Sequence, residues 1–77
     1  MTLHEAKKDG KYTVKELLVE PIAARRLQAL GLNEGTQLTV LNRKRKGALI
    51  IRVRGTRLAL GRHLSANISI EEADENA

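Results

Sequence analysis

The chain has 77 residues, enough for a single domain with a compact aliphatic core and too few for a second domain. It contains no cysteine, which excludes a disulfide framework, a thiolate metal site and a cysteine nucleophile. Its 14 Lys and Arg residues exceed its 9 Asp and Glu residues, and the resulting net charge of +5 favours an anionic partner such as nucleic acid, anionic lipid or an acidic protein surface.

The basic residues are concentrated in one part of the sequence. No acidic residue lies between Glu34 and Glu71, and the basic residues of that interval are Arg43, Lys44, Arg45, Lys46, Arg52, Arg54, Arg57 and Arg62. The longest apolar run, Ala48 to Ile51, is far shorter than the roughly 20 residues that cross a bilayer, so we expect no direct membrane insertion. The lack of cysteines and of a secretion signal favours the cytoplasm, where a partner would have to recruit the protein to the membrane.

The first predicted element is a single helical turn near the N-terminus. Thr2 and Glu5 fit a capping box, in which the two side chains satisfy free backbone amides, and the turn should extend to Lys7 or Lys8. The Asp-Gly pair that follows indicates a tight turn. Residues 11–19 are rich in β-formers and predict a strand, although their second half also suits a helix.

A helix is predicted to begin at Pro21, whose missing amide proton costs nothing in the first helical turn. Ala23, Leu27 and Leu30 then share one apolar face. Gly31 follows the last helical leucine, where a left-handed residue ends a helix at low cost. With Gly35, it predicts a helix-to-strand joint, and we assign the same structural role to Gly55 between two later strands.

After the joint, apolar residues alternate with polar ones, which predicts strands. The apolar residues that share faces of these strands are Leu38 with Val40, Leu49 with Ile51 and Val53, Leu58 with Leu60, and Ile68 with Ile70. The short connections, residues 42–47 and 55–56, favour antiparallel hairpins, and residues 63–67 predict one helical turn.

These elements predict a mainly β fold: a small barrel of about five antiparallel strands with one or two short helices. Closure into a barrel is the most economical arrangement, since it removes exposed strand edges. We expect the domain to occupy residues 1–70 and residues 71–77 to form an acidic, disordered tail.

Several segments in this order resemble one known family. They are Arg26-Leu27-x-x-Leu30-Gly31-Leu32-x-x-Gly35, the Leu38-x-Val40-Leu41 strand, Ile51-Arg52-Val53-Arg54-Gly55, Leu58-Ala59-Leu60 and Ala66-x-Ile68-x-Ile70. Together they are similar to FeoA, the small cytosolic ferrous iron transport protein A. The resemblance covers residues 3 to 70 and implies an SH3-like β-barrel that binds and modulates FeoB, the membrane ferrous-iron permease with a cytosolic GTP-binding domain.

The resemblance also leaves a regulatory alternative, because a similar domain forms the C-terminal part of some metal-dependent transcriptional repressors. Here no winged-helix or metal-binding region precedes the domain, which favours a transport accessory. A nucleic-acid binder that uses the basic strands is the competing hypothesis. Because Tyr12 is the single aromatic residue, base stacking is excluded as a main source of affinity, and only weak, non-specific phosphate binding is expected.

Metal binding and catalysis are not expected. His4 and His63 are the only histidines, and a stable metal site generally needs three or four converging donors. The acidic residues are scattered rather than clustered, so the sequence predicts no enzyme activity, no cofactor and no metal ligands.

The candidate partner-binding residues combine apolar and basic side chains. Leu32 and Leu41 fit the core pattern least well, so they either cap the barrel or form an exposed contact. Arg52, Arg54 and Arg57 alternate with core residues, and they form either a solvated outer face or a charged rim around that contact.

Overall fold

The computed structural model describes residues 1–73. Within them, the strands are β1 (Lys11–Leu17), β2 (Gln37–Arg43), β3 (Leu49–Val53), β4 (Thr56–Leu60) and β5 (Ile68–Glu72). The helices are α1 (Pro21–Ala29) and α2 (Arg62–Ser65), and the short 3-10 turns are η1 (Leu3–Glu5) and η2 (Arg45–Gly47). The alternative of a helix in the second half of β1 is therefore wrong.

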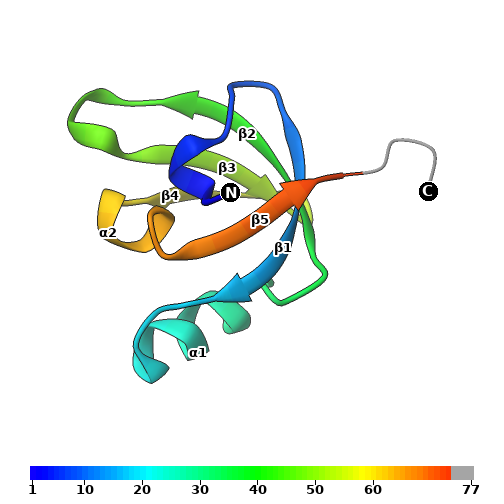
Figure 1. Cartoon of the computed structure of the whole chain (residues 1–77), viewed down its shortest axis with the longest axis vertical. Coiled ribbons are helices and arrows are strands. Elements are labelled where there is room, and N and C mark those ends of the chain that lie inside the picture. Colours follow the sequence, from blue (N-terminus) through cyan, green and yellow to red (C-terminus); the bar gives the residue numbers. More distant parts are fainter. Residues whose placement is uncertain (74–77) are drawn as a thin grey trace.

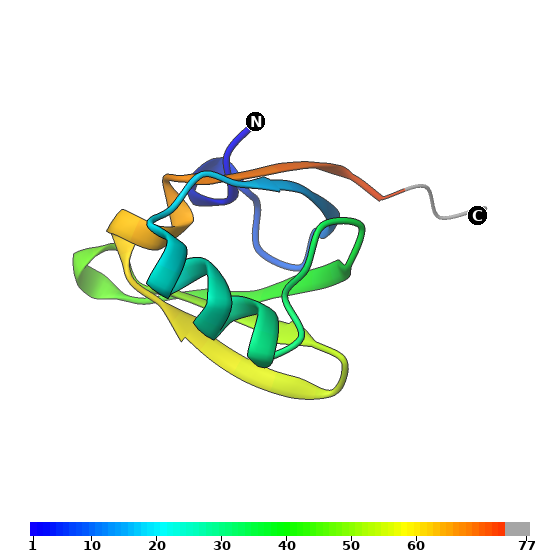
Figure 2. The same cartoon turned by 90° about the horizontal axis from the view of Figure 1, so that it is seen from below.

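The strands of this region form one antiparallel sheet in the order β4-β3-β2-β1-β5. The sheet curls strongly (Figure 1), and its outer strands, β4 and β5, lie on opposite sides of the molecule with α1 between them (Figure 2). The mainly β prediction with five antiparallel strands is confirmed. The sheet is curled like a barrel but is not closed by hydrogen bonds, because β4 and β5 are not paired with each other. We call this open, curled sheet the half-barrel, and β4 and β5 are its two edge strands.

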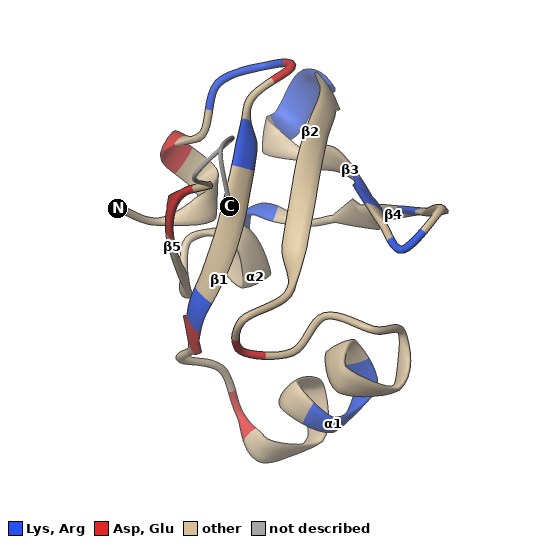
Figure 3. Cartoon of the chain, turned by 90° about the vertical axis from the view of Figure 1, so that its right-hand side faces the viewer, with Lys and Arg blue, Asp and Glu red and all other residues tan. Residues whose placement is uncertain are grey.

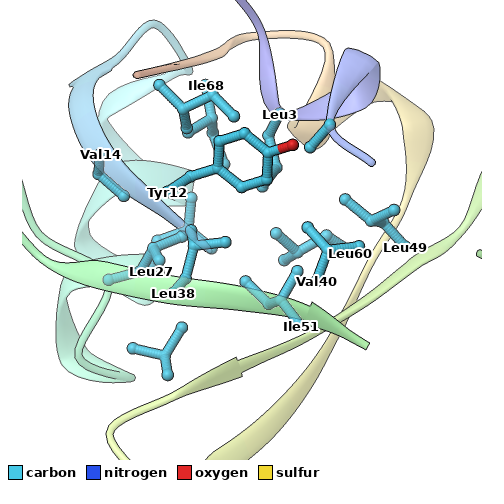
Figure 4. Close-up of a cluster of buried hydrophobic side chains, with 14 residues drawn as sticks. Leu3, Tyr12, Val14, Leu27, Leu38, Val40, Leu49, Ile51, Leu60 and Ile68 are labelled. Atoms are coloured by element: carbon cyan, nitrogen blue, oxygen red, sulfur yellow. The ribbon is translucent and has the colours of Figure 1, made fainter. Parts of the chain in front are cut away.

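The core lies inside the curled sheet and is almost entirely aliphatic. Alternate residues of each strand point inward, as the period-two pattern predicted, and pack with Leu3, Leu27 and Leu32 (Figure 4). Tyr12 supplies the aromatic ring, and its hydroxyl accepts a hydrogen bond from the backbone N–H of Lys7 at 2.9 Å.

The N-terminal turn is shorter than predicted, because η1 ends at Glu5 and not at Lys7 or Lys8. The predicted reciprocal contact is present: the backbone N–H of Thr2 donates to the Glu5 carboxylate at 2.8 Å. The chain then becomes extended at Ala6, which is only 3% exposed. A continued helix would carry this buried alanine away from the core.

The predicted domain end at residue 70 also needs correction. Glu71 and Glu72 belong to β5, where they pair with Thr13 and Tyr12 of β1. Ladder hydrogen bonds use the backbone, so polar side chains do not prevent a strand from continuing. The rest of the predicted acidic tail, residues 74–77, lies outside the described residues.

Helix α1 lies across the open side of the half-barrel, next to β4 (Figure 2). Helix α1 buries fewer side chains than its sequence predicted. Leu27 is buried at 3% exposure, Ala23 is half-buried, and Leu30 is 49% exposed. The prediction that Leu30 belongs to the buried face is therefore wrong.

The helix-to-strand joint has the predicted backbone, with Gly31 at φ +97° and Gly35 at φ +86°. The N–H of Gly31 donates to the carbonyl of Gln28, and that of Leu32 to the carbonyl of Leu27. These two bonds define a Schellman motif, in which the residue after the left-handed glycine packs back on the last helical turn. This motif explains why Leu32 is fully buried beside Leu27.

Candidate interaction surface

An apolar groove runs between α1, β4 and α2, and its volume is about 560 Å³. The residues that line it are Glu20, Ile22, Ala23, Arg26, Leu27, Leu30, Ala59, Leu60 and Leu64. The walls therefore combine α1 with the consecutive elements β4 and α2, which lie about 30 residues further along the chain, and α1 contributes the largest share.

Two large apolar side chains of the groove wall are strongly exposed. Ile22 is 72% exposed and Leu30 is 49% exposed, although both lie on α1 or at its end, close to the buried Leu27. Contiguous exposed apolar side chains around a concavity often mark an interaction site. Sequence reasoning missed this site, although a signal existed: Ile22 and Leu30, eight residues apart, lie within one broad apolar stripe of a helix, separated by about 80° around its axis.

One end of the groove carries a polar contact between Glu20 and His63. The His63 Nε2 and the Glu20 Oε1 lie 3.3 Å apart, and both side chains are largely exposed. His4 is elsewhere, on η1, and its backbone carbonyl accepts a hydrogen bond from Arg43 at 2.7 Å. In residues 1–73, no group of three or more His, Cys, Asp or Glu side chains is arranged to hold a metal ion.

The outer face of the β3–β4 hairpin is basic. Arg52 and Arg57 are directly paired across the two strands, and both are exposed. Arg54 and Gly55 form the two-residue turn, with φ values of +50° and +80°. Positive φ at both positions is the pattern of a type I′ turn, in which Asn or Asp usually precedes the glycine. An arginine there is an unusual choice.

The structure brings the predicted partner-binding residues only partly together. Leu41 and Arg57 line one shallow depression, together with Asn42, Lys44 and Ile50. Arg52 and Arg54 line a second depression with Lys11, Gln37, Leu38, Thr39 and Gly55. Leu32 is fully buried, so the hypothesis that it is an exposed contact is wrong and its alternative role in the core is correct.

Charge is unevenly distributed, because residues 35–70 contain eight basic residues and no acidic one. In the ribbon of Figure 3, Lys and Arg positions lie on β3, β4 and the β2–β3 connection and also on β1 and α1, while acidic positions lie on β5, near the N-terminus and in the connections around α1. In residues 1–73, the ion pairs are Lys15 with Glu71 and His63 with Glu20, and neither includes an arginine of the β3–β4 hairpin. These arginines are therefore available to an acidic partner.

A family model described as the FeoA domain matches residues 1–72. The chain belongs to the FeoA family. A protein named Putative Fe(2+) transport protein A, from Methanocaldococcus jannaschii, is 35% identical over 69 residues, which is 90% of this chain and 83% of that protein. The solution structure of the FeoA protein from Chlorobium tepidum has 29% sequence identity and a TM-score of 0.90, covering 96% of this chain and 71% of the other.

This FeoA-family chain also shares its fold with part of a repressor. ScaR, a manganese-activated repressor, is 23% identical with a TM-score of 0.83, and the match covers 95% of this chain and 35% of the repressor. That level of identity establishes a common SH3-like fold alone. Within residues 1–73, no helix has the length and apolar character needed to cross a membrane.

Proposed function

We propose that this FeoA-family protein is an accessory factor of ferrous iron uptake that binds the cytosolic part of a FeoB-like, GTP-dependent permease and modulates its transport. The proposal rests on FeoA membership together with an apolar groove in which the large side chains Ile22 and Leu30 are exposed. The protein then acts by binding rather than by catalysis. Any nucleotide chemistry belongs to the permease.

The docking face that we propose is centred on β4. The groove supplies an apolar centre through Ile22 and Leu30, and Arg26 in its lining supplies positive charge. Arg57 lies on the same strand as the groove-lining Ala59 and lines the depression next to Leu41. An apolar centre that loses water on binding gives affinity, and a charged rim steers the partner and sets its orientation. Leu41, Arg52 and Arg54 extend this face over the outer side of the hairpin.

The first test compares a double variant of the groove with a single variant outside it. Ile22→Gln with Leu30→Gln should weaken association with the permease by at least tenfold, because each exposed apolar side chain buried on binding contributes about 1.5–3 kcal/mol. Leu18→Gln is the control, since Leu18 is 57% exposed but lies outside the groove lining. Co-purification with the permease in each nucleotide state measures association, and uptake of radioactive ferrous iron at limiting iron measures function.

The proposal is wrong if deletion of the protein leaves ferrous iron uptake unchanged and the purified protein fails to bind the permease in every nucleotide state. If the protein instead binds one DNA sequence selectively at physiological salt, a regulatory role becomes the better explanation of its basic residues between positions 35 and 70. If Leu18→Gln impairs binding as much as the groove variant does, the groove is not the docking site.

A further inference from the structure

The two edge strands of the sheet, β4 and β5, differ in whether other residues cover their outer backbone groups. The β5 edge is covered by the N-terminal residues: the N–H of Ile70 donates to the carbonyl of Met1 at 2.9 Å, and Thr2 forms a bridge with Ser69. Within residues 1–73, the β4 edge has no such cover. A bare strand edge is a template for pairing with another chain, and natural proteins usually protect it.

The register identifies the free backbone groups of this edge. Val53 and Thr56 flank the two-residue turn and therefore form a hydrogen-bonded pair, so the hydrogen-bonded positions of β4 alternate from Thr56 onward. The N–H and C=O groups of Arg57 and Ala59 consequently point away from β3. In residues 1–73, no backbone bond from a turn, loop or other element reaches these groups.

The free edge opens into the apolar groove. Ala59, whose backbone faces outward, is one of the groove-lining residues, and Ile22 and Leu30 stand on the opposite wall, which α1 forms. A strand that paired with Ala59 would place alternate side chains between β4 and α1, because successive side chains of a strand point to opposite faces. The free backbone groups and the apolar groove thus belong to one surface.

We propose that this edge accepts an extended, acidic segment of the partner protein as a sixth strand, with alternate apolar side chains in the groove. Main-chain hydrogen bonds to Arg57 and Ala59 then supply part of the affinity, and the apolar groove selects the sequence. The inference rests on the proposed function for the identity of the partner, namely the cytosolic part of the permease.

Charge favours an acidic segment over a second copy of this chain. Two β4 edges that paired with each other would bring Arg57 and the neighbouring Arg52 and Arg54 of both copies together. Like charges on adjacent strands destabilise pairing, and the net charge of +5 adds repulsion between whole molecules. A segment with Asp or Glu beside its apolar residues meets these arginines with the opposite charge.

Backbone methylation of the ligand tests strand addition directly. Overlapping synthetic peptides that cover the cytosolic part of the permease are first screened for binding, and the best binder is then N-methylated at one position at a time. Methylation should weaken binding by about tenfold at alternate positions and leave the intervening positions unaffected, because one amide in two faces β4. The amide protons of Arg57 and Ala59 should exchange more slowly when the peptide is bound.

A variant of the protein gives an independent readout. Ala59→Pro removes the outward N–H and leaves the β3–β4 ladder intact, since proline is tolerated where the N–H of an edge strand faces solvent. It should weaken peptide binding about tenfold. Ala59→Ser, which keeps the N–H, is the matched control and should bind like the wild type.

The outcomes separate the two proposals. If the permease binds the protein but every N-methylated peptide binds equally well, or the peptide binds as a helix, strand addition is wrong and the accessory role stands. If neither the permease nor any of its peptides binds, both proposals fail. Association of the protein with itself through β4, in place of peptide binding, would also overturn the inference.

Discussion

Gly31 shows how one residue decides the path of the chain. Its backbone has φ +97°, and an added Cβ would lie 3.1 Å from Cδ of Arg54. Gly31→Val should therefore lower stability by roughly 1–2 kcal/mol from backbone strain alone, which corresponds to about 4–8 °C in Tm for each kcal/mol. Thermal melts followed by circular dichroism measure the loss.

Gly61→Val is the matched control for that substitution. Gly61 has φ −69°, and no neighbouring atom lies within 4 Å of the position that a Cβ would occupy, so an added Cβ meets neither left-handed strain nor a neighbour there. Equal melting temperatures for the two variants would contradict the assignment of Gly31 as a required left-handed residue.

Glu5 predicts a specific pH dependence. The hydrogen bond from the Thr2 backbone N–H, followed by that from the Thr2 hydroxyl, lowers the pKa of the Glu5 carboxyl below its ordinary value. A lowered folded-state pKa contributes stability above the unfolded-state pKa, and this contribution is lost as pH falls through the folded-state pKa. Glu5→Gln should thus be less stable than the wild type at neutral pH, with a difference that closes on acidification.

Melts of both proteins across the acidic range measure this difference, and NMR titration of the Glu5 carboxyl measures its pKa. Thr2→Val should raise that pKa only part of the way, because the backbone N–H remains. A stability difference independent of pH would show that the Thr2–Glu5 contact does not depend on the charge.

Leu30 and Leu32 mark the limit of residue-level prediction from this sequence. Helical periodicity predicts that Leu30 is in the core and leaves Leu32 unexplained, whereas the structure exposes the first and buries the second. The reason is local: after the left-handed Gly31 the chain folds back, so the next residue packs on Leu27. The Leu-Gly-Leu sequence carried this signal, because a Schellman motif favours an apolar residue after its glycine.

The β3–β4 hairpin pairs two arginines at a cost to its own stability. Arg52 and Arg57 face each other at a position without ladder hydrogen bonds, where side chains approach most closely. Arg57→Thr should raise the stability of the isolated protein by about 0.2–1 kcal/mol, since threonine favours strands and the repulsion disappears. The gain should shrink at high salt, which screens the repulsion.

Arg45→Thr is the control for this variant, because Arg45 is an exposed arginine of η2 and has no residue paired with it across a strand. Melts at low and high salt compare the two. Should Arg57→Thr be destabilising, or its effect be independent of salt, the pair would not be repulsive. The same variant should weaken binding of the permease, which would explain why the costly pair is present.

At the level of elements, the sequence predicted the strands well and their ends less well. Each strand buries one face, so the alternation of apolar and polar residues was visible in residues 38–40, 49–53 and 58–60. The extension of β5 to Glu72 was not visible, because backbone pairing with Tyr12 leaves no trace in side-chain chemistry. The same is true of the open seam between β4 and β5.

At the scale of the whole molecule, the uneven distribution of charge predicts weak binding of nucleic acid. The basic residues between positions 35 and 70 should bind duplex DNA weakly and without sequence preference, because they contact phosphates and phosphates carry no sequence information. Affinity should fall steeply between about 50 and 200 mM salt. Fluorescence anisotropy with two unrelated duplexes measures both effects, and selective binding that persists at physiological salt would contradict them.

The fold family could be predicted from ordered motifs along the chain, but the groove could not. One wall comes from α1 and the other from the consecutive elements β4 and α2, and these two parts of the sequence meet only in the folded chain. The groove depends on how far α1 stands from β4, which is set by the packing of Leu27 and the turn at Gly31. The distance between α1 and β4 therefore depends on tertiary packing and cannot be predicted from either segment alone.

The cover over the β5 edge also guards the protein against polymerisation. A chain truncated to begin at Leu3 would lose the Met1 and Thr2 contacts to β5 and carry two bare edges, one bearing Glu71 and Glu72 and the other bearing Arg57. Opposite edges of opposite charge can join head to tail, and such a contact adds further molecules wherever the rotation between neighbours does not close a ring. We expect the truncated chain to grow into filaments that scatter light and dissolve in high salt, while the full chain remains dispersed under the same conditions.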